Sequence, residues 1–169
     1  PEQRNAMNNQ MAQELHQVAD FLASTDGIRV VILRGAGGHF CAGGDIKERK
    51  QQTDSAKPTM DPARDRNVRS GQLFKKLWNL PQTFIVVVEG AAMGGGFGLA
   101  CLADLTLVSK DAKLGMPETT LGISPAQIAP YVVKRIGLTR AKQMALTAER
   151  INGEQAYHLG IAQYLADTN

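Results

Sequence analysis

The chain has 169 residues, of which 43% are hydrophobic and 21% charged, and its formal net charge is +3. This length and composition predict one globular domain, residues 1–169, with a buried core. The mild charge does not indicate nucleic-acid binding, although it suits a ligand that carries several phosphates. No apolar run approaches roughly 18 residues, so no membrane span is expected. No signal peptide is visible, and two cysteines give no disulfide framework. We therefore expect a cytoplasmic protein with reduced thiols.

The first elements predicted along the chain are a helix, a strand and a glycine-rich turn. Apolar residues recur at helical spacing and predict an amphipathic helix over residues 8–24. The apolar run 30–33 predicts a strand, and glycines among residues 35–38 and 43–44 allow sharp turns after it. These turns lead toward a helix-forming stretch over 46–50.

A polar segment over residues 50–67 interrupts this pattern. It contains two prolines and few apolar residues, which predicts a mobile loop. The sequence leaves open whether this loop is a lid or a disordered insertion. A helix over 68–78 follows, and its apolar residues are expected to pack in the core.

A second strand–turn–helix unit lies about 50 residues after the first. The β-branched run 84–88 predicts a buried strand, the glycine triplet 94–96 a sharp turn, and residues 97–102 a helix. The N–H groups at a helix start carry partial positive charge. Two such turns side by side can offer one N–H each to a single oxygen, which is the geometry of an oxyanion hole.

Later residues predict structural features. A strand is expected over residues 104–109, with Asp104 as a cap or turn residue rather than a catalytic acid. Thr139 and Asn152 are expected to be the N-caps of two further helices.

Three motifs resemble those of the enoyl-CoA hydratase/isomerase (crotonase) family, in the family's order and spacing. They are Phe40-Cys-Ala-Gly-Gly-Asp-Ile-Lys47, Gly94-Gly-Gly96 and Leu114-Gly-Met-Pro-Glu-Thr-Thr-Leu-Gly122. The resemblance runs over essentially the whole chain and implies an α/β fold: a crotonase-like spiral of ββα units with two roughly perpendicular sheets. Within the family, residues 94–100 and 117–130 are most similar to the branch that hydrates isohexenylglutaconyl-CoA.

The resemblance also implies the catalytic groups. The backbone N–H groups of Gly44 and Gly95 would bind the thioester oxygen, which becomes enolate-like during the reaction. Glu118, placed after Pro117, would move the proton as an acid and base. Glu89 falls outside the family's catalytic positions and is expected to be structural.

Coenzyme A would lie along a strip that the resemblance places in two segments. Backbone groups would meet its adenine and pantetheine arm, and Lys47 would lie near phosphate, although a solvated lysine on a helix face is a rival interpretation. Arg4 is equally well explained as a solvated surface residue. The predicted binding residues are Arg4, Ala6, Ala42, Gly44, Asp45, Ile46 and Lys47.

One departure from the family's pattern leaves the reaction open. The commonest hydratases have a second glutamate where this chain has Gly98, which can neither give nor take a proton. One carboxylate suffices to move a double bond, so isomerisation is an alternative to hydration of a branched acyl-CoA. A second alternative is a non-catalytic acyl-CoA-binding homologue. If the position of the acid is vacant, Gly98→Glu is expected to raise activity toward short, unbranched enoyl-CoA.

No separate cofactor is expected, because CoA belongs to the substrate. The three histidines show no metal-ligand spacing and the two cysteines no base partner, so neither a metal site nor a cysteine nucleophile is predicted. The resemblance implies a homotrimer or a dimer of trimers. It also implies truncation at both ends, with the C-terminal trimerisation helices of the family absent from the 169 residues.

Overall fold

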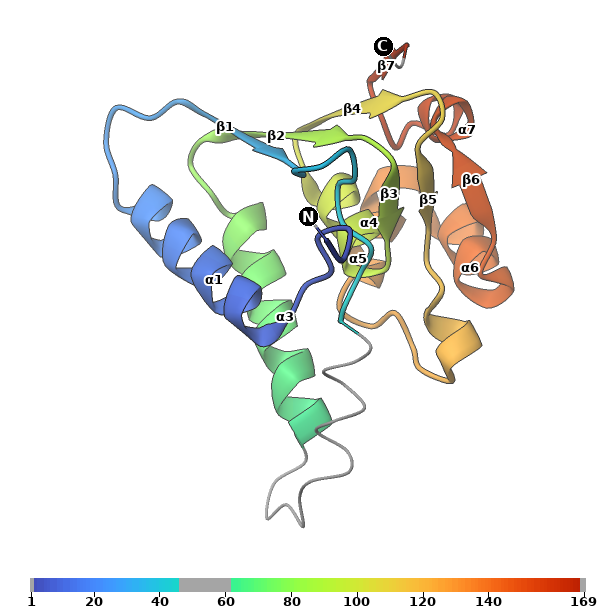
Figure 1. Ribbon diagram of the computed structural model, residues 1–169, viewed down its shortest axis with the longest axis horizontal. Helices are drawn as coiled ribbons and strands as arrows, with labels where there is room; N and C mark the ends of the chain where they lie inside the picture. The colour runs from blue at the N-terminus through green and yellow to red at the C-terminus, as the bar shows by residue number, and fades with distance from the viewer. Residues whose placement is uncertain (1, 46–61, 168–169) are drawn as a thin grey trace.

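The computed structural model describes residues 2–45 and 62–167. Helices and strands are interspersed along the chain (Figure 1). In chain order they are α1 (Asn9–Ala23), β1 (Val30–Arg34), α3 (Pro62–Trp78), β2 (Thr83–Val88), β3 (Ala91–Met93), α4 (Gly95–Leu102), β4 (Leu105–Ser109), β5 (Lys113–Gly115), the 3₁₀ helix η1 (Glu118–Leu121), α5 (Ala129–Ile136), α6 (Leu138–Thr147), β6 (Arg150–Asn152), α7 (Gly153–His158) and β7 (Tyr164–Ala166).

The strands form two sheets. The first is a parallel sheet in the order β1-β2-β4-β7, and the second has the order β3-β5-β6. In the second sheet β3 pairs with β5 in parallel, and β5 pairs with β6 antiparallel. The strands of the second sheet run crosswise to β1 and β2 in Figure 1, with α1 and α3 to one side and α6 close to β6 on the other. This confirms the predicted α/β crotonase-like fold.

Helix α4 lies at the centre of the core. Every residue from Gly96 to Leu102 is buried, and the helix contacts α3, α5, β2 and β3. Such a uniformly apolar helix has no solvent face, which is why its sequence lacks an amphipathic pattern. Around it pack the fully buried side chains of Leu73, Leu114, Met116 and Met144. The turn before α4 is therefore fixed by the core.

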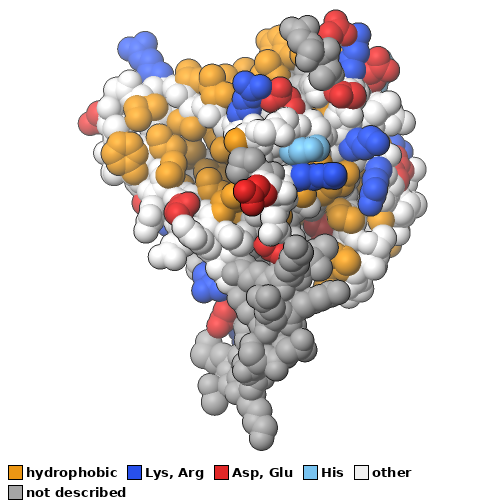
Figure 2. Space-filling view, in the orientation of Figure 1, with side chains coloured by type: hydrophobic (Ala, Val, Ile, Leu, Met, Phe, Trp, Pro, Cys, Tyr) orange, Lys and Arg blue, Asp and Glu red, His pale blue; other side chains and the backbone are white. Residues whose placement is uncertain are grey.

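One edge of the molecule exposes apolar side chains. Val18 and Phe21 of α1 are 50% and 61% exposed, and Val30 and Ile32 of the edge strand β1 are 49% and 64% exposed. Figure 2 shows hydrophobic side chains gathered at the left of the view, over α1 and β1. The predicted strand over 30–33 is confirmed as β1, and one of its faces is exposed. No helix in the described ranges has the length and apolar character needed to cross a bilayer.

Several predicted boundaries are confirmed and one is wrong. The helix over 8–24 corresponds to α1, whose N-cap Asn8 accepts a hydrogen bond from the Met11 N–H. Helix α3 begins at Pro62, so the predicted loop over 50–67 extends too far. Proline suits a first helical turn because it has no N–H to leave unpaired. The predicted helix over 46–50 and the rest of that loop up to residue 61 lie outside the described residues.

The predicted capping residues have mixed outcomes. Asn152 caps α7 in a reciprocal capping box with Gln155. Thr139 is not an N-cap, because α6 begins one residue earlier and its N-cap is Gly137. Asp104 is structural as predicted: its carboxylate accepts the Phe84 N–H at 2.7 Å, and its own N–H donates to the Phe84 carbonyl at 2.8 Å.

Candidate active site

The first predicted donor segment, residues 41–45, is held by the N-terminal residues of the chain. The Met7 N–H donates to the Gly43 carbonyl at 2.7 Å, and the Asp45 N–H donates to the Met7 carbonyl at 3.0 Å. These two bonds flank Gly44. The Asn5 side chain ties the same N-terminal segment to the turn after β1, donating to the carbonyls of Ala36 and His39 at 2.8 and 2.6 Å.

The second donor segment is the turn from β3 into α4. Gly94 has φ +52°, a conformation that strongly favours glycine, and its N–H donates to the Gly115 carbonyl at 2.9 Å. Gly95 is the first residue of α4. The N–H groups in the first turn of a helix have no partner within the helix and carry the positive end of its dipole. The Gly95 amide is therefore positioned to donate outward.

The two donor segments are in direct contact. The Cys41 N–H donates to the Ala91 carbonyl at 2.8 Å, and the Met93 N–H donates to the Cys41 carbonyl at 2.9 Å. Glycine at position 96 makes this approach possible, because a Cβ there would lie only 2.6 Å from the Cys41 carbonyl oxygen. Within residues 2–45 and 62–167, neither the Gly44 nor the Gly95 N–H donates to a backbone carbonyl.

Glu118 lies at the start of η1, directly after Pro117. The backbone there is held by the Ile123 N–H, which donates to the Glu118 carbonyl at 3.1 Å, and Gly122 ends the turn in the left-handed conformation. A Cβ placed on Gly94 would lie 3.0 Å from Glu118 Oε1 and 4.0 Å from the Gly43 Cα. The carboxylate is thus beside both donor segments, and Oε2 is shielded from solvent.

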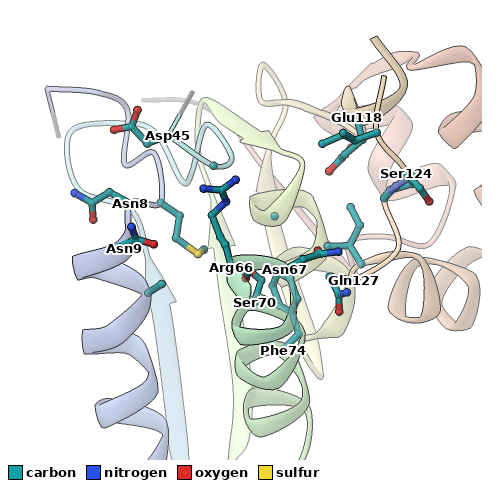
Figure 3. Close-up of a pocket in the computed structure, with 17 residues that line it drawn as sticks. Asn8, Asn9, Asp45, Arg66, Asn67, Ser70, Phe74, Glu118, Ser124 and Gln127 are labelled. Carbon is teal, nitrogen blue, oxygen red and sulfur yellow. The ribbon is translucent and has the colours of Figure 1, made fainter. Parts of the chain in front are cut away.

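All three predicted catalytic residues line one pocket of about 790 Å³, a volume that includes the solvent space at its mouth. Figure 3 shows that its lining residues come from the start of α1, from α3 and from the segment after η1. The lining residues are Met7, Asn8, Asn9, Ala12, Gly44, Asp45, Arg66, Asn67, Ser70, Phe74, Gly95, Glu118, Ile123, Ser124, Pro125, Gln127 and Ile128. The pocket therefore joins two donor amides, a carboxylate and a mixed polar and apolar wall.

The structure corrects the idea of a vacant acid position at Gly98. This glycine is buried, and a Cβ there would lie 2.3 Å from Cγ2 and 2.8 Å from Cβ of Ile128. Ile128 fills the space into which a side chain at 98 would extend. Gly98→Glu alone would force a carboxylate against a buried isoleucine, so a gain of activity from that single change is no longer expected.

The predicted CoA strip is partly brought together. The Ala42 N–H donates to the Arg4 carbonyl at 3.0 Å, which places Arg4 and Ala6 alongside Ala42, Gly44 and Asp45. Of these five, only Gly44 and Asp45 line the pocket, and the Arg4 side chain is exposed. Ile46 and Lys47 lie outside the described residues.

The other titratable residues considered from the sequence have structural surroundings. Glu89 accepts two hydrogen bonds from Arg34, at 2.6 and 2.9 Å, and these hold the pKa of the carboxyl below its usual value. His39 is half buried and accepts the Ala91 N–H at 3.2 Å, with the tautomer assigned from that contact. Burial raises the pKa of both thiols, that of Cys101 to about 12. Among the described residues no three His, Cys, Asp or Glu side chains are grouped as for a metal ion.

Sequence reasoning missed Asn5, Arg66 and Gln127. Arg66 is half buried on α3 and extends into the pocket in Figure 3. Gln127 lies against α3 because Gly71 has no side chain; a Cβ there would lie 2.0 Å from Gln127 Oε1. Arg66 lies at the end of a polar segment that borders the acyl pocket in the resembled family, and this placement could have drawn attention to it. Nothing in the sequence, however, distinguished Arg66 from Arg64 and Arg69.

Comparisons with known proteins agree with this geometry. The model of the enoyl-CoA hydratase/isomerase family matches residues 1–167. An enoyl-CoA hydratase/isomerase from Marinobacter aquaeolei is 46% identical with a TM-score of 0.93, and Pseudomonas aeruginosa AtuE is 45% identical with a TM-score of 0.94; each match covers 99% of this chain and 64% of the other. The mitochondrial methylglutaconyl-CoA hydratase of Mus musculus is 30% identical over 98% of this chain and 52% of its own length.

The chain thus spans between half and two thirds of the length of these proteins. The family match extends over both donor segments, the glutamate and the pocket that contains them. This chain belongs to the enoyl-CoA hydratase/isomerase family.

Proposed function

We infer that the protein adds water across the double bond of a branched α,β-unsaturated acyl-CoA, giving a 3-hydroxyacyl-CoA. The observation that carries this proposal is the single pocket lined by Gly44, Gly95 and Glu118. The finer assignment, an isohexenylglutaconyl-CoA-like substrate, is supported by the similarity of residues 94–100 and 117–130 to that branch of the family. A relative named for methylglutaconyl-CoA adds support for a branched substrate.

In the proposed reaction the thioester oxygen binds the Gly44 and Gly95 N–H groups. Glu118 takes a proton from water as the water oxygen bonds to Cβ, and the electron pair of the double bond moves through Cα toward the thioester oxygen. The protonated Glu118 then returns its proton to Cα, which restores the thioester. One carboxylate thus balances the addition, and each donor contributes roughly 3–4 kcal/mol of transition-state stabilisation.

A second candidate is double-bond isomerisation, and the packing at Gly98 favours it. Where common hydratases have a further carboxylate, Ile128 fills the space beside Gly98. A lone Glu118 can take a proton from Cγ of a 3-enoyl-CoA and return it to Cα, with the same amides holding the enolate oxygen. Both reactions use the same three groups.

Incubation with 2-enoyl-CoA and with 3-enoyl-CoA separates the candidates. Hydration removes the absorbance of the conjugated thioester, isomerisation creates it, and a non-catalytic binder changes neither. Glu118→Gln should lower the rate about 10²–10⁴-fold while the dissociation constant for a saturated acyl-CoA changes little. A Glu118→Gln variant with the wild-type rate would overturn the assignment of Glu118.

The assembly and setting are proposals that the resemblance to the family supports. We propose a cytoplasmic homotrimer or dimer of trimers for the protein that contains this chain. Analytical ultracentrifugation of that protein tests the assembly, and a monomeric mass with full activity would contradict it.

A further inference from the structure

Three glycines near the start of α4 each face a different side chain of the pocket wall. These contacts are Gly94 with Glu118, Gly95 with Phe74, and Gly98 with Ile128. The contact at Gly98 is the tightest of the three, because a Cβ there would lie only 2.3 Å from Ile128 Cγ2. The isoleucine therefore packs directly against the backbone of the helix.

Ile128 separates the pocket from α4. Its side chain lines the pocket and is only 3% exposed, whereas Gly98 is buried behind it and is not among the lining residues. The Ile128 N–H donates to the Pro125 carbonyl at 3.1 Å, and its carbonyl accepts the Val132 N–H at 3.1 Å. A β-branched side chain has few rotamers available to it. Ile128 is therefore a rigid part of the wall.

This part of the wall lies close to the proposed reacting groups. The Gly98 N–H donates to the Gly94 carbonyl at 2.9 Å, so the two glycines are one helical turn apart on one face of α4. Glu118 lies over the first of them and Ile128 over the second. An acyl group whose thioester oxygen binds the Gly95 N–H keeps its α- and β-carbons near that oxygen, because they follow the carbonyl carbon directly. Ile128 is thus expected beside the reacting carbons and not at the far end of the acyl group.

An isoleucine in this place limits the space beside those carbons. Because its side chain is already packed against Gly98, it can yield to a bulky substituent only at an energetic cost. We propose that Ile128 is a specificity-determining residue that sets how much bulk an acyl group can carry at its α- and β-carbons. Gly98 acts through Ile128, because the lack of a side chain at 98 allows the isoleucine to lie against α4 instead of further into the pocket.

This proposal rests on the proposed function, because it names the part of the substrate that Ile128 contacts in the same pocket. Isomeric acyl-CoAs test it without turnover. Valeryl-CoA is unbranched, isovaleryl-CoA has a methyl group on the β-carbon, and 2-methylbutyryl-CoA has one on the α-carbon. The three have the same acyl formula and no double bond, so their dissociation constants compare shape at nearly equal hydrophobicity. The branch preference is the dissociation constant of valeryl-CoA divided by that of a branched isomer.

Calorimetry on the protein that contains this chain compares variants that move the wall in opposite directions. Ile128→Ala opens space beside Gly98 and should raise the branch preference on the order of tenfold, the effect expected for one methyl group in an apolar pocket. Ile128→Val, which removes a single methyl group, should raise it less. Gly98→Ala pushes the isoleucine toward the pocket and should lower the branch preference. The double variant Gly98→Ala/Ile128→Ala should lie between the two single variants.

Val132→Ala is the matched control. Val132 lies one turn after Ile128 on α5, is fully buried and is not among the residues that line the pocket. Its truncation also leaves a cavity in the core, but the branch preference should stay within about twofold of wild type. An equal change in Val132→Ala and Ile128→Ala, or the same direction of change in Gly98→Ala and Ile128→Ala, would overturn the role of Ile128.

Kinetics then connect binding with turnover. 3-Methylcrotonyl-CoA differs from crotonyl-CoA by one methyl group on the β-carbon. Ile128→Ala should raise kcat/KM for the methylated substrate relative to crotonyl-CoA, and Gly98→Ala should lower it. The expected shifts in branch preference without turnover of any 2-enoyl- or 3-enoyl-CoA would overturn the proposed function and leave the role of Ile128 in place. Hydration with the same branch preference in all variants would overturn the role of Ile128 alone.

Discussion

The two predicted donor amides belong to backbone segments that are stabilised in different ways. The Gly95 amide begins a helix in which every later residue is buried, so core packing fixes it. The Gly44 amide lies in an irregular segment that is held by hydrogen bonds to Arg4 and Met7. Regions with few buried apolar contacts open locally at lower free energy than the core does. We therefore expect the segment that contains Gly95 to open only when the whole fold unfolds. The segment that contains Gly44 is expected to be destabilised by substitutions that leave the core folded.

The largest effect is expected where the two segments touch. In Gly96→Ala the new Cβ would lie 2.6 Å from the Cys41 carbonyl oxygen, so backbone must shift in α4 or in the first donor segment. We expect a loss of about 3 kcal/mol in the free energy of unfolding and a large loss of the proposed hydration activity. Urea unfolding followed by circular dichroism measures the free energy of unfolding.

Gly95→Ala is the matched control for that stability measurement. A Cβ at 95 would be 3.7 Å from Phe74 Cζ, an ordinary contact, and alanine favours a helix more than glycine does. Its free energy of unfolding should stay within about 1 kcal/mol of wild type. Equal destabilisation by the two changes would contradict the contact described between α4 and Cys41.

A smaller effect of an added methyl group is expected on the far side of α4. Gly98→Ala places a Cβ 2.3 Å from Ile128 Cγ2 and should cost about 1–3 kcal/mol. Ile128→Ala should cost about 2–4 kcal/mol by leaving a cavity. In the double variant the new methyl group enters that cavity, so the combined loss should fall short of the sum by at least about 1 kcal/mol. Additive losses would show that Ile128 does not fill the space beside Gly98.

The Gly44 side is tested through Asn5. Asn5→Gly keeps the positive φ of 54° accessible while removing the two hydrogen bonds to Ala36 and His39. We expect a loss of about 1–2 kcal/mol in stability together with lower activity, since the segment that holds Gly44 is loosened. Asn152→Ala, which removes a helix cap and should also cost about 1 kcal/mol, is the control and should leave activity unchanged. If both variants lose activity equally, stability alone explains the effect of Asn5→Gly.

The smallest effect is a difference in thiol reactivity. Cys41 lies in the first donor segment and Cys101 in α4, and burial raises the pKa of each, so the reactive thiolate is scarce at pH 8 in the folded protein. Labelling then requires local opening. Cys41 should react with iodoacetamide on the order of tenfold faster than Cys101, as measured by mass spectrometry of the peptides. A faster reaction at Cys101 would contradict the expectation that the first donor segment opens at lower free energy than α4.

The fold class was predicted from the resemblance of three local motifs to those of the family. The strands and glycine-rich turns of the two donor segments were predicted from the residues themselves, because glycine spacing and β-branched runs express local backbone requirements. Glu118 was also accessible, since its motif is local. Arg66, Gln127 and the Gly98–Ile128 contact were not, because each depends on how segments far apart in the chain pack together. The start of α3 at Pro62 was missed because the polar residues that follow it carry no helical pattern of apolar side chains.

The described residues that line the pocket all fall between Met7 and Ile128, whereas β6, α7 and β7 come later in the chain. During synthesis on the ribosome every one of these lining residues is therefore made before β5 has an antiparallel partner and before β4 has its outer neighbour. The ligand surface and the last sheet edges are thus completed in separate steps, and an acyl-CoA bound to the growing chain would meet a pocket whose supporting sheets still have open sides.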